Sequence, residues 1–93
     1  MNLQEEISKE GCTIVKFFSQ TCGPCKMMSP MLKNLSETRG VKIIDIDVHG
    51  EDKDIASEHG VASVPTLEFY KDGELTSTHV GAMPMPQLLK RLV

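Results

Sequence analysis

The sequence predicts an α/β protein in which helices cover a mixed four-stranded sheet. Helical and strand-like segments alternate along the chain in the order α-β-α-β-α-β-β-α, which is the pattern of a layered sandwich. A helix separates the first two strands, and a β-α-β crossover makes such strands parallel. The last two strands flank Asp72-Gly73, a strong signal for a tight hairpin that joins antiparallel strands.

The first half of the chain is expected to hold two helices and two strands. They are residues 2–10, 12–18, 23–39 and 41–47. The first of the strands is a short run of β-branched and aromatic residues, the pattern of a buried strand. The long helix carries an apolar stripe at positions i, i+3, i+4 and i+7, and Gly40 ends it. The stripe consists of Met28, Met31, Leu32 and Leu35.

The second half is expected to hold two more helices and the two hairpin strands. They are residues 51–59, 66–71, 74–80 and 85–93. Gly60 is the expected end of the first of these helices, because glycine adopts the left-handed backbone conformation without strain. Pro84 or Pro86 fits the first turn of the last helix, where a missing N–H costs no helical hydrogen bond.

Composition points to one domain and argues against several classes of partner. The 93 residues have enough apolar content (40%) for one modest core, so we expect a single domain over residues 1–93. The net charge of -3 is interspersed, which favours neither nucleic acid nor a membrane surface as partner. No run approaches the roughly 20 apolar residues that cross a bilayer. The acidic N-terminal segment is unlike a signal peptide, so we expect a cytoplasmic location.

Cys22-Gly23-Pro24-Cys25 is the segment that carries chemistry. The two thiols can close a small disulfide ring, and the flanking elements place them on a strand-to-helix turn. Unpaired backbone N–H groups and the positive end of the helix dipole favour a thiolate there. Cys22 precedes the helix and is expected to be exposed, whereas Cys25 lies one turn in and is expected to be shielded. In the cytosol such a pair is more often catalytic or metal-binding than structural.

From about residue 12 onward the chain resembles the thioredoxin family. The resemblance rests on Cys-Gly-Pro-Cys-Lys at 22–26 and on Val64-Pro65-Thr66. It extends to Pro30, Asp47, Lys71-Asp72-Gly73-Glu74 and Val80-Gly81-Ala82. The family fold that it implies is a three-layer α/β/α sandwich, here expected to lack the N-terminal edge strand that usually precedes the first helix.

The resemblance implies a thiol–disulfide oxidoreductase that reduces protein disulfides. The Cys22 thiolate would attack a substrate disulfide, and Cys25 would resolve the mixed disulfide. In the family, a Gly-Pro pair such as Gly23-Pro24 accompanies a dithiol that favours the reduction of substrate disulfides over their formation. The cysteines carry the electrons themselves, so no cofactor is expected. An NADPH-dependent flavoprotein thioredoxin reductase would be the electron donor, and the protein is expected to be a monomer.

A groove for an extended substrate peptide is also implied by the resemblance. Val64, Pro65 and Gly81 would line it around Cys22, and Pro65 would follow a cis peptide bond. Thr21 stands where most family members carry Trp, and the chain contains no Trp. The surface beside the dithiol is therefore expected to be flatter, with a changed choice of partner.

Lys16 is the main departure from the family pattern, since typical members carry a buried Asp there beneath the dithiol. Two interpretations are open. In the first, the Lys16 amine points toward the dithiol and stabilises the thiolate, because a cation within about 4–6 Å favours an anion. In the second, Lys16 reaches solvent or pairs with Asp45 and has no catalytic role.

Two other functions fit parts of the sequence. A glutaredoxin-like reductase that uses glutathione would suit the short N-terminus, although Val80-Gly81-Ala82-Met83 replaces the Gly-Gly-x-Asp-like segment of that family. The second of these functions is a zinc site or a non-enzymatic binding module. A structural zinc needs four ligands and the chain has a single Cys-x-x-Cys, so no metal site is expected.

The remaining cysteine and the histidines are expected to have no part in the chemistry. Cys12 lies at the far end of the first strand, too distant to pair with Cys22 or Cys25, because a disulfide needs Cα atoms within about 7 Å. The three histidines show no ligand spacing and are expected at the surface or at helix ends. They are His49, His59 and His79.

Overall fold

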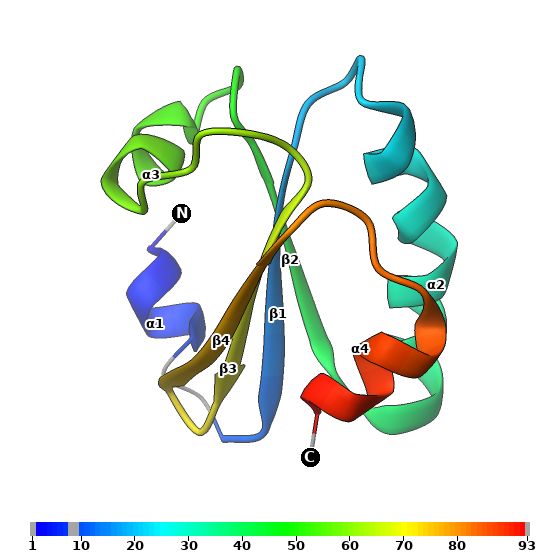
Figure 1. Ribbon diagram of the computed structural model, residues 1–93. Coiled ribbons are helices and arrows are strands. Elements are labelled where there is room, and N and C mark those ends of the chain that lie inside the picture. The colour runs from blue at the N-terminus through cyan, green and yellow to red at the C-terminus, as the bar shows by residue number, and fades with distance from the viewer. Residues whose placement is uncertain (1, 8–9, 93) are drawn as a thin grey trace.

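A computed structural model describes residues 2–7 and 10–92 of the chain. Within these residues it contains one four-stranded sheet in the order β2-β1-β3-β4, with helices on both faces (Figure 1). The strands are β1 (Cys12–Phe18), β2 (Lys42–Asp47), β3 (Thr66–Lys71) and β4 (Glu74–Val80). The helices are α1 (Leu3–Ile7), α2 (Gly23–Arg39), α3 (Lys53–Glu58) and α4 (Met85–Arg91). The predicted three-layer α/β/α sandwich with a mixed sheet is confirmed.

Strand pairing follows the prediction. β1 is parallel to β2 and antiparallel to β3, and β3 is antiparallel to β4. The hairpin turn places Asp72 at φ 50° and Gly73 at φ 90°, and two positive φ values give the twist that a two-residue hairpin needs. The Asp72 carboxylate also accepts a 2.8 Å hydrogen bond from the Gly11 N–H, which ties the turn to the segment before β1.

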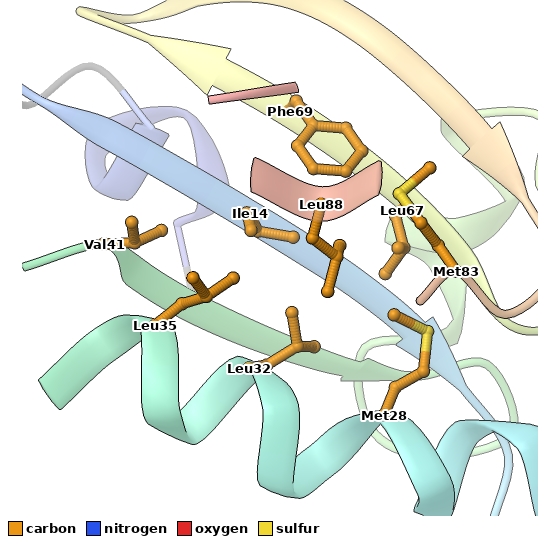
Figure 2. Close-up of a cluster of buried hydrophobic side chains, with 9 residues drawn as sticks. All are labelled: Ile14, Met28, Leu32, Leu35, Val41, Leu67, Phe69, Met83 and Leu88. Atoms are coloured by element: carbon orange, nitrogen blue, oxygen red, sulfur yellow. The ribbon is translucent and has the colours of Figure 1, made fainter. Parts of the chain in front are cut away.

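Each face of the sheet has its own apolar core, because alternate residues of a strand point to opposite faces. Figure 2 shows the core on the α2 and α4 side, where Leu32 and Leu35 of α2 approach Ile14 of β1. This core consists of Ile14, Met28, Leu32, Leu35, Val41, Leu67, Phe69, Met83 and Leu88. The core beneath α1 and α3 consists of Leu3, Ile7, Val15, Phe17, Ile44, Ile46, Ala56 and Tyr70. The predicted stripe of the long helix is thus the buried face of α2, with Met31 at its edge.

Three helices are shorter than the sequence predicted. α1 ends at Ile7 and Glu10 is not helical, while residues 8–9 of the predicted helix lie outside the described residues. α3 begins at Lys53, because turn bonds from the Gly50 N–H to Asp47 O and from the Lys53 N–H to Gly50 O replace a first helical turn. α4 ends at Arg91, and residue 93 lies outside the described residues.

The sheet brings three loops to one end. Phe17 of β1 lies opposite Thr66 of β3, and Thr66 lies opposite Val80 of β4. The segments after β1, before β3 and after β4 therefore meet at the same end of the sheet (Figure 1). They carry the dithiol, Pro65 and Gly81, respectively. In the described part of the chain, no helix has the length and apolarity to cross a membrane.

Candidate active site

The dithiol occupies the turn between β1 and the start of α2. Cys22 is the N-cap residue of α2, with an extended backbone (φ -84°, ψ 109°), and its Sγ accepts a 3.1 Å hydrogen bond from the Cys25 N–H. The Cys22 N–H in turn donates to Ser19 O at 3.2 Å, which closes the turn. Pro24 stands in the first turn of the helix, where its missing N–H costs nothing. The predicted strand-to-helix placement is confirmed.

The two sulfur atoms form a disulfide and differ in exposure. The Cα atoms of Cys22 and Cys25 lie 5.3 Å apart, within the normal range for a bridged pair. Cys22 is partly exposed, whereas Cys25 is only 2% exposed. Gly23 and Pro24, between them, are exposed. Cys22 is therefore the more exposed of the two residues, which is the difference in exposure that the sequence predicted.

The segments at the ends of β3 and β4 lie at the same end of the sheet as the dithiol. The Val64–Pro65 peptide bond is cis, as the family resemblance implied. Pro65 is buried and its carbonyl accepts a 2.8 Å hydrogen bond from the Gly81 N–H. Gly81 has φ 101°, a left-handed value that favours glycine. Val64 is half-buried, and Thr21 is exposed with its Oγ1 3.4 Å from Ser19 Oγ.

Lys16 lies under α2 with its amine held by two partners. Nζ donates a 2.8 Å hydrogen bond to Ser29 Oγ and lies 3.2 Å from Asp45 Oδ1. The Lys16 side chain is 6% exposed, so it does not reach freely into solvent. The pairing with Asp45 that the second interpretation expected is present. The cavity that contains the amine is nevertheless lined by Cys25 as well, and the Ser29 hydroxyl lies 3.4 Å from the Cys25 carbonyl oxygen.

Cys12 is remote from the dithiol and unpaired, as predicted. Its sulfur lies 4.0 Å from the carbonyl oxygen of Leu92, at the opposite end of β1. Among the described residues, no group of three or more His, Cys, Asp and Glu side chains is placed to hold a metal ion. The described residues therefore offer no candidate set of ligands for a zinc ion.

A buried polar cluster on the α1 and α3 side was not anticipated. His59 Nδ1 lies 2.8 and 3.0 Å from the two carboxylate oxygens of Glu68, and the Tyr70 hydroxyl donates a 2.7 Å hydrogen bond to the same carboxylate. Burial, followed by this hydrogen bond and the Glu68 charge, raises the pKa of Tyr70 above its ordinary value. The signal available in the sequence was Glu68 itself, an acidic residue between the apolar residues Leu67 and Phe69 of β3.

Comparison with known proteins gives one consistent family. The thioredoxin family model matches residues 1–93. A curated relative named thioredoxin, from Bacillus subtilis, is 42% identical over 83 residues that cover 87% of this chain and 79% of the relative. A mutant thioredoxin from Halobacterium salinarum superposes with a TM-score of 0.88 at 32% identity, covering 97% of this chain and 79% of that one. Oxidised mitochondrial thioredoxin 3 from Saccharomyces cerevisiae gives 0.84 at 34% identity, covering 97% and 84%.

Proposed function

The chain belongs to the thioredoxin family and is a thiol–disulfide oxidoreductase that reduces protein disulfides, and we propose that Cys22 and Cys25 have distinct roles in this reaction. The Cys22 thiolate attacks one sulfur of the substrate disulfide, forming a mixed disulfide and releasing the other substrate sulfur as a thiolate. The Cys25 thiolate then attacks Cys22, which releases the second substrate thiolate. Two electrons have then passed to the substrate, and the pair ends as the disulfide seen in the structure.

One observation carries this assignment of roles. Cys22 is partly exposed and its sulfur accepts a hydrogen bond from the Cys25 N–H, while Cys25 itself is only 2% exposed. A backbone N–H at a helix N-terminus stabilises negative charge on the sulfur that it contacts. The accessible sulfur is therefore also the one whose ionised form is favoured, which is what an attacking nucleophile requires.

The peptide groove is proposed to run past Cys22 between the loops that precede β3 and follow β4. Val64, Pro65 and Gly81 would line it, with Thr21 on the side of the dithiol. The hydrogen bond from the Gly81 N–H to Pro65 O supports this position, because it holds the two loops together at the end of the sheet that carries the dithiol. Thr21 offers a small polar surface here, so affinity would depend more on the backbone than on an aromatic contact.

Lys16 is proposed as a supporting residue rather than a catalytic one. Its charge lies in the same cavity as Cys25, and Asp45 and Ser29 fix the position of its amine. A fixed cation beneath the dithiol favours the thiolate form of the reduced pair. Because Asp45 offsets part of this charge, the expected effect is modest.

The cofactor requirement, location and electron donor that we propose are those that a dithiol–disulfide exchange reaction needs. The cysteine pair is its own redox centre, so the reaction requires no cofactor within this protein. We propose a single domain over residues 1–93 that works as a monomer in the cytoplasm, where a reducing pool keeps a dithiol reduced. An NADPH-dependent flavoprotein thioredoxin reductase would regenerate the dithiol.

Reduction of insulin disulfides with dithiothreitol as electron donor tests the proposal. Cys22→Ser is expected to abolish catalysis, and Cys25→Ser is expected to trap a covalent complex with the substrate. Cys12→Ser is the matched control and should retain native activity. The assignment fails if Cys22→Ser keeps activity, or if iodoacetamide labels Cys25 ahead of Cys22 in the reduced native protein. Replacing dithiothreitol by glutathione alone tests the glutaredoxin-like alternative, which requires rapid turnover under that condition.

A further inference from the structure

A polar groove leads away from the dithiol between α2 and β2. Two cavities of about 350 and 300 Å³ share Lys16, Ser29 and Asp45 in their walls, so they lie side by side along α2, and together they are called the groove. Cys25 lines the first cavity, and Lys33 lines the second, two helical turns further along α2. This groove is distinct from the proposed peptide groove, which lies at the end of the sheet beside Pro65.

Basic side chains outnumber acidic ones in the lining of the groove. Asp45 pairs with Lys16, so these two charges offset each other at its floor. Lys26 lines the groove beside Cys25, and Lys33 lines its far part. Both lysines are exposed, both belong to the same side of α2 at a spacing of seven residues, and neither has an ion pair among the described residues.

The helices on the two faces of the sheet carry opposite charge. α2 and α4 contain Lys26, Lys33, Arg39, Lys90 and Arg91 against one acidic residue, Glu37. α1 and α3 contain Glu5, Glu6, Asp54 and Glu58 against one basic residue, Lys53. A partner with an acidic surface is therefore attracted to the side of the molecule that holds the groove and repelled from the other side.

We propose that the α2/β2 groove is a secondary recognition site for an acidic peptide segment that flanks the substrate disulfide. The inference rests on the proposed function, because it names the class of protein disulfide that the dithiol reduces best. With the substrate sulfur at Cys22, an acidic stretch that extends along α2 meets Lys26 and then Lys33. The hydroxyl of Ser36, which also lines the groove, can donate a hydrogen bond to one of its carboxylates.

The test uses disulfide-bonded peptides that are identical except for runs of Glu, Gln or Lys on both sides of the disulfide. The quantity measured is kcat/KM for each peptide, expressed as the ratio of acidic to neutral. For the native protein at low salt we expect a ratio of roughly fivefold, which is the scale of a few solvent-exposed ion pairs. High salt should bring the ratio toward one, because ions screen charges on the surface.

Two charge-reversal variants separate the groove from the overall charge of the protein. Lys33→Glu should bring the ratio to one or below. Lys90→Glu makes the same change in net charge on α4, outside the groove, and should lower the ratio much less than Lys33→Glu does. Lys33→Gln and Lys90→Gln repeat the comparison with smaller perturbation if a reversed charge impairs folding.

Several outcomes would overturn the inference. A native ratio of one or less rules out recognition of acidic flanks. An equal loss in the Lys33 and Lys90 variants indicates general electrostatic steering instead of a groove. Failure to reduce the neutral peptide at all contradicts the proposed function itself, and the inference is overturned together with it.

Discussion

The amine of Lys16 lies 3.2 Å from the carboxylate of Asp45, and the two side chains differ sharply in their environment. Lys16 is 6% exposed and Asp45 is 53% exposed. The cation is therefore removed from water while its partner remains largely solvated. Removing one member of this pair should not have the same consequence as removing the other, because only the lysine has lost its hydration.

The free energy of unfolding should change differently when Lys16 and when Asp45 is replaced. Asp45→Asn leaves the buried ammonium with Ser29 and a neutral amide, and should lower the free energy of unfolding by about 1 kcal/mol, a small value because water screens the exposed partner. Lys16→Met removes the buried charge and keeps a side chain of similar length, so it should be neutral or stabilising. Urea unfolding of both variants measures the difference, and a larger loss in Lys16→Met would contradict this account.

The reactivity of the dithiol should also depend on Lys16. In the reduced protein, Lys16→Met is expected to shift the midpoint of Cys22 alkylation to higher pH, since a cation that favours the thiolate has been removed. The rate of iodoacetamide labelling as a function of pH measures the midpoint. Lys42→Met, on the opposite face of the sheet and paired with Glu6, is a matched control. An unchanged midpoint would show that Lys16 has only the structural role of pairing with Asp45.

Leucines on α2 and β4 should differ widely in their contribution to stability. Leu32 is 1% exposed within the core beneath α2 (Figure 2), and Leu32→Ala should cost about 2–5 kcal/mol through lost burial and a residual cavity. Leu75 on β4 is 54% exposed, and Leu75→Ala should cost no more than about 1 kcal/mol. Similar losses in the two variants, measured by denaturant unfolding, would contradict the described packing.

Stability at high pH should depend on Tyr70. Burial and the contact with Glu68 raise the pKa of its hydroxyl in the folded state, whereas an unfolded tyrosine ionises near pH ~10. Above that pH the unfolded state binds fewer protons than the folded state, so the free energy of unfolding falls as pH rises. The stabilisation is complete below pH ~10 and is lost toward the higher folded-state pKa.

The single tyrosine makes this prediction directly measurable. Tyrosinate absorbance should appear in unfolded protein at a lower pH than in folded protein. Tyr70→Phe should flatten the decline of stability between pH ~9 and ~11, compared with the native protein. An equal decline in both proteins would assign the effect to groups other than Tyr70.

Local sequence was sufficient for most of the architecture. The bounds of α2, β1 and the β3–β4 hairpin match their predicted ranges, because apolar periodicity and turn residues are encoded within each segment. The short helices α1 and α3 were overestimated, since short turns and helices compete closely and the outcome depends on a few local hydrogen bonds. The position of Cys22 and Cys25 also followed from their local context.

What the sequence by itself determined is the order of the elements and the site of the thiols, both set by residues that are neighbours along the chain. Tertiary structure decided which distant groups meet: it placed Asp45 against Lys16, one of the arrangements that the sequence left open, and it joined His59 to Glu68, which the sequence did not predict. Each of these contacts joins separate elements, so its partner is fixed by strand register and by the packing of helices on the sheet. A pattern within one segment contains no information on that geometry.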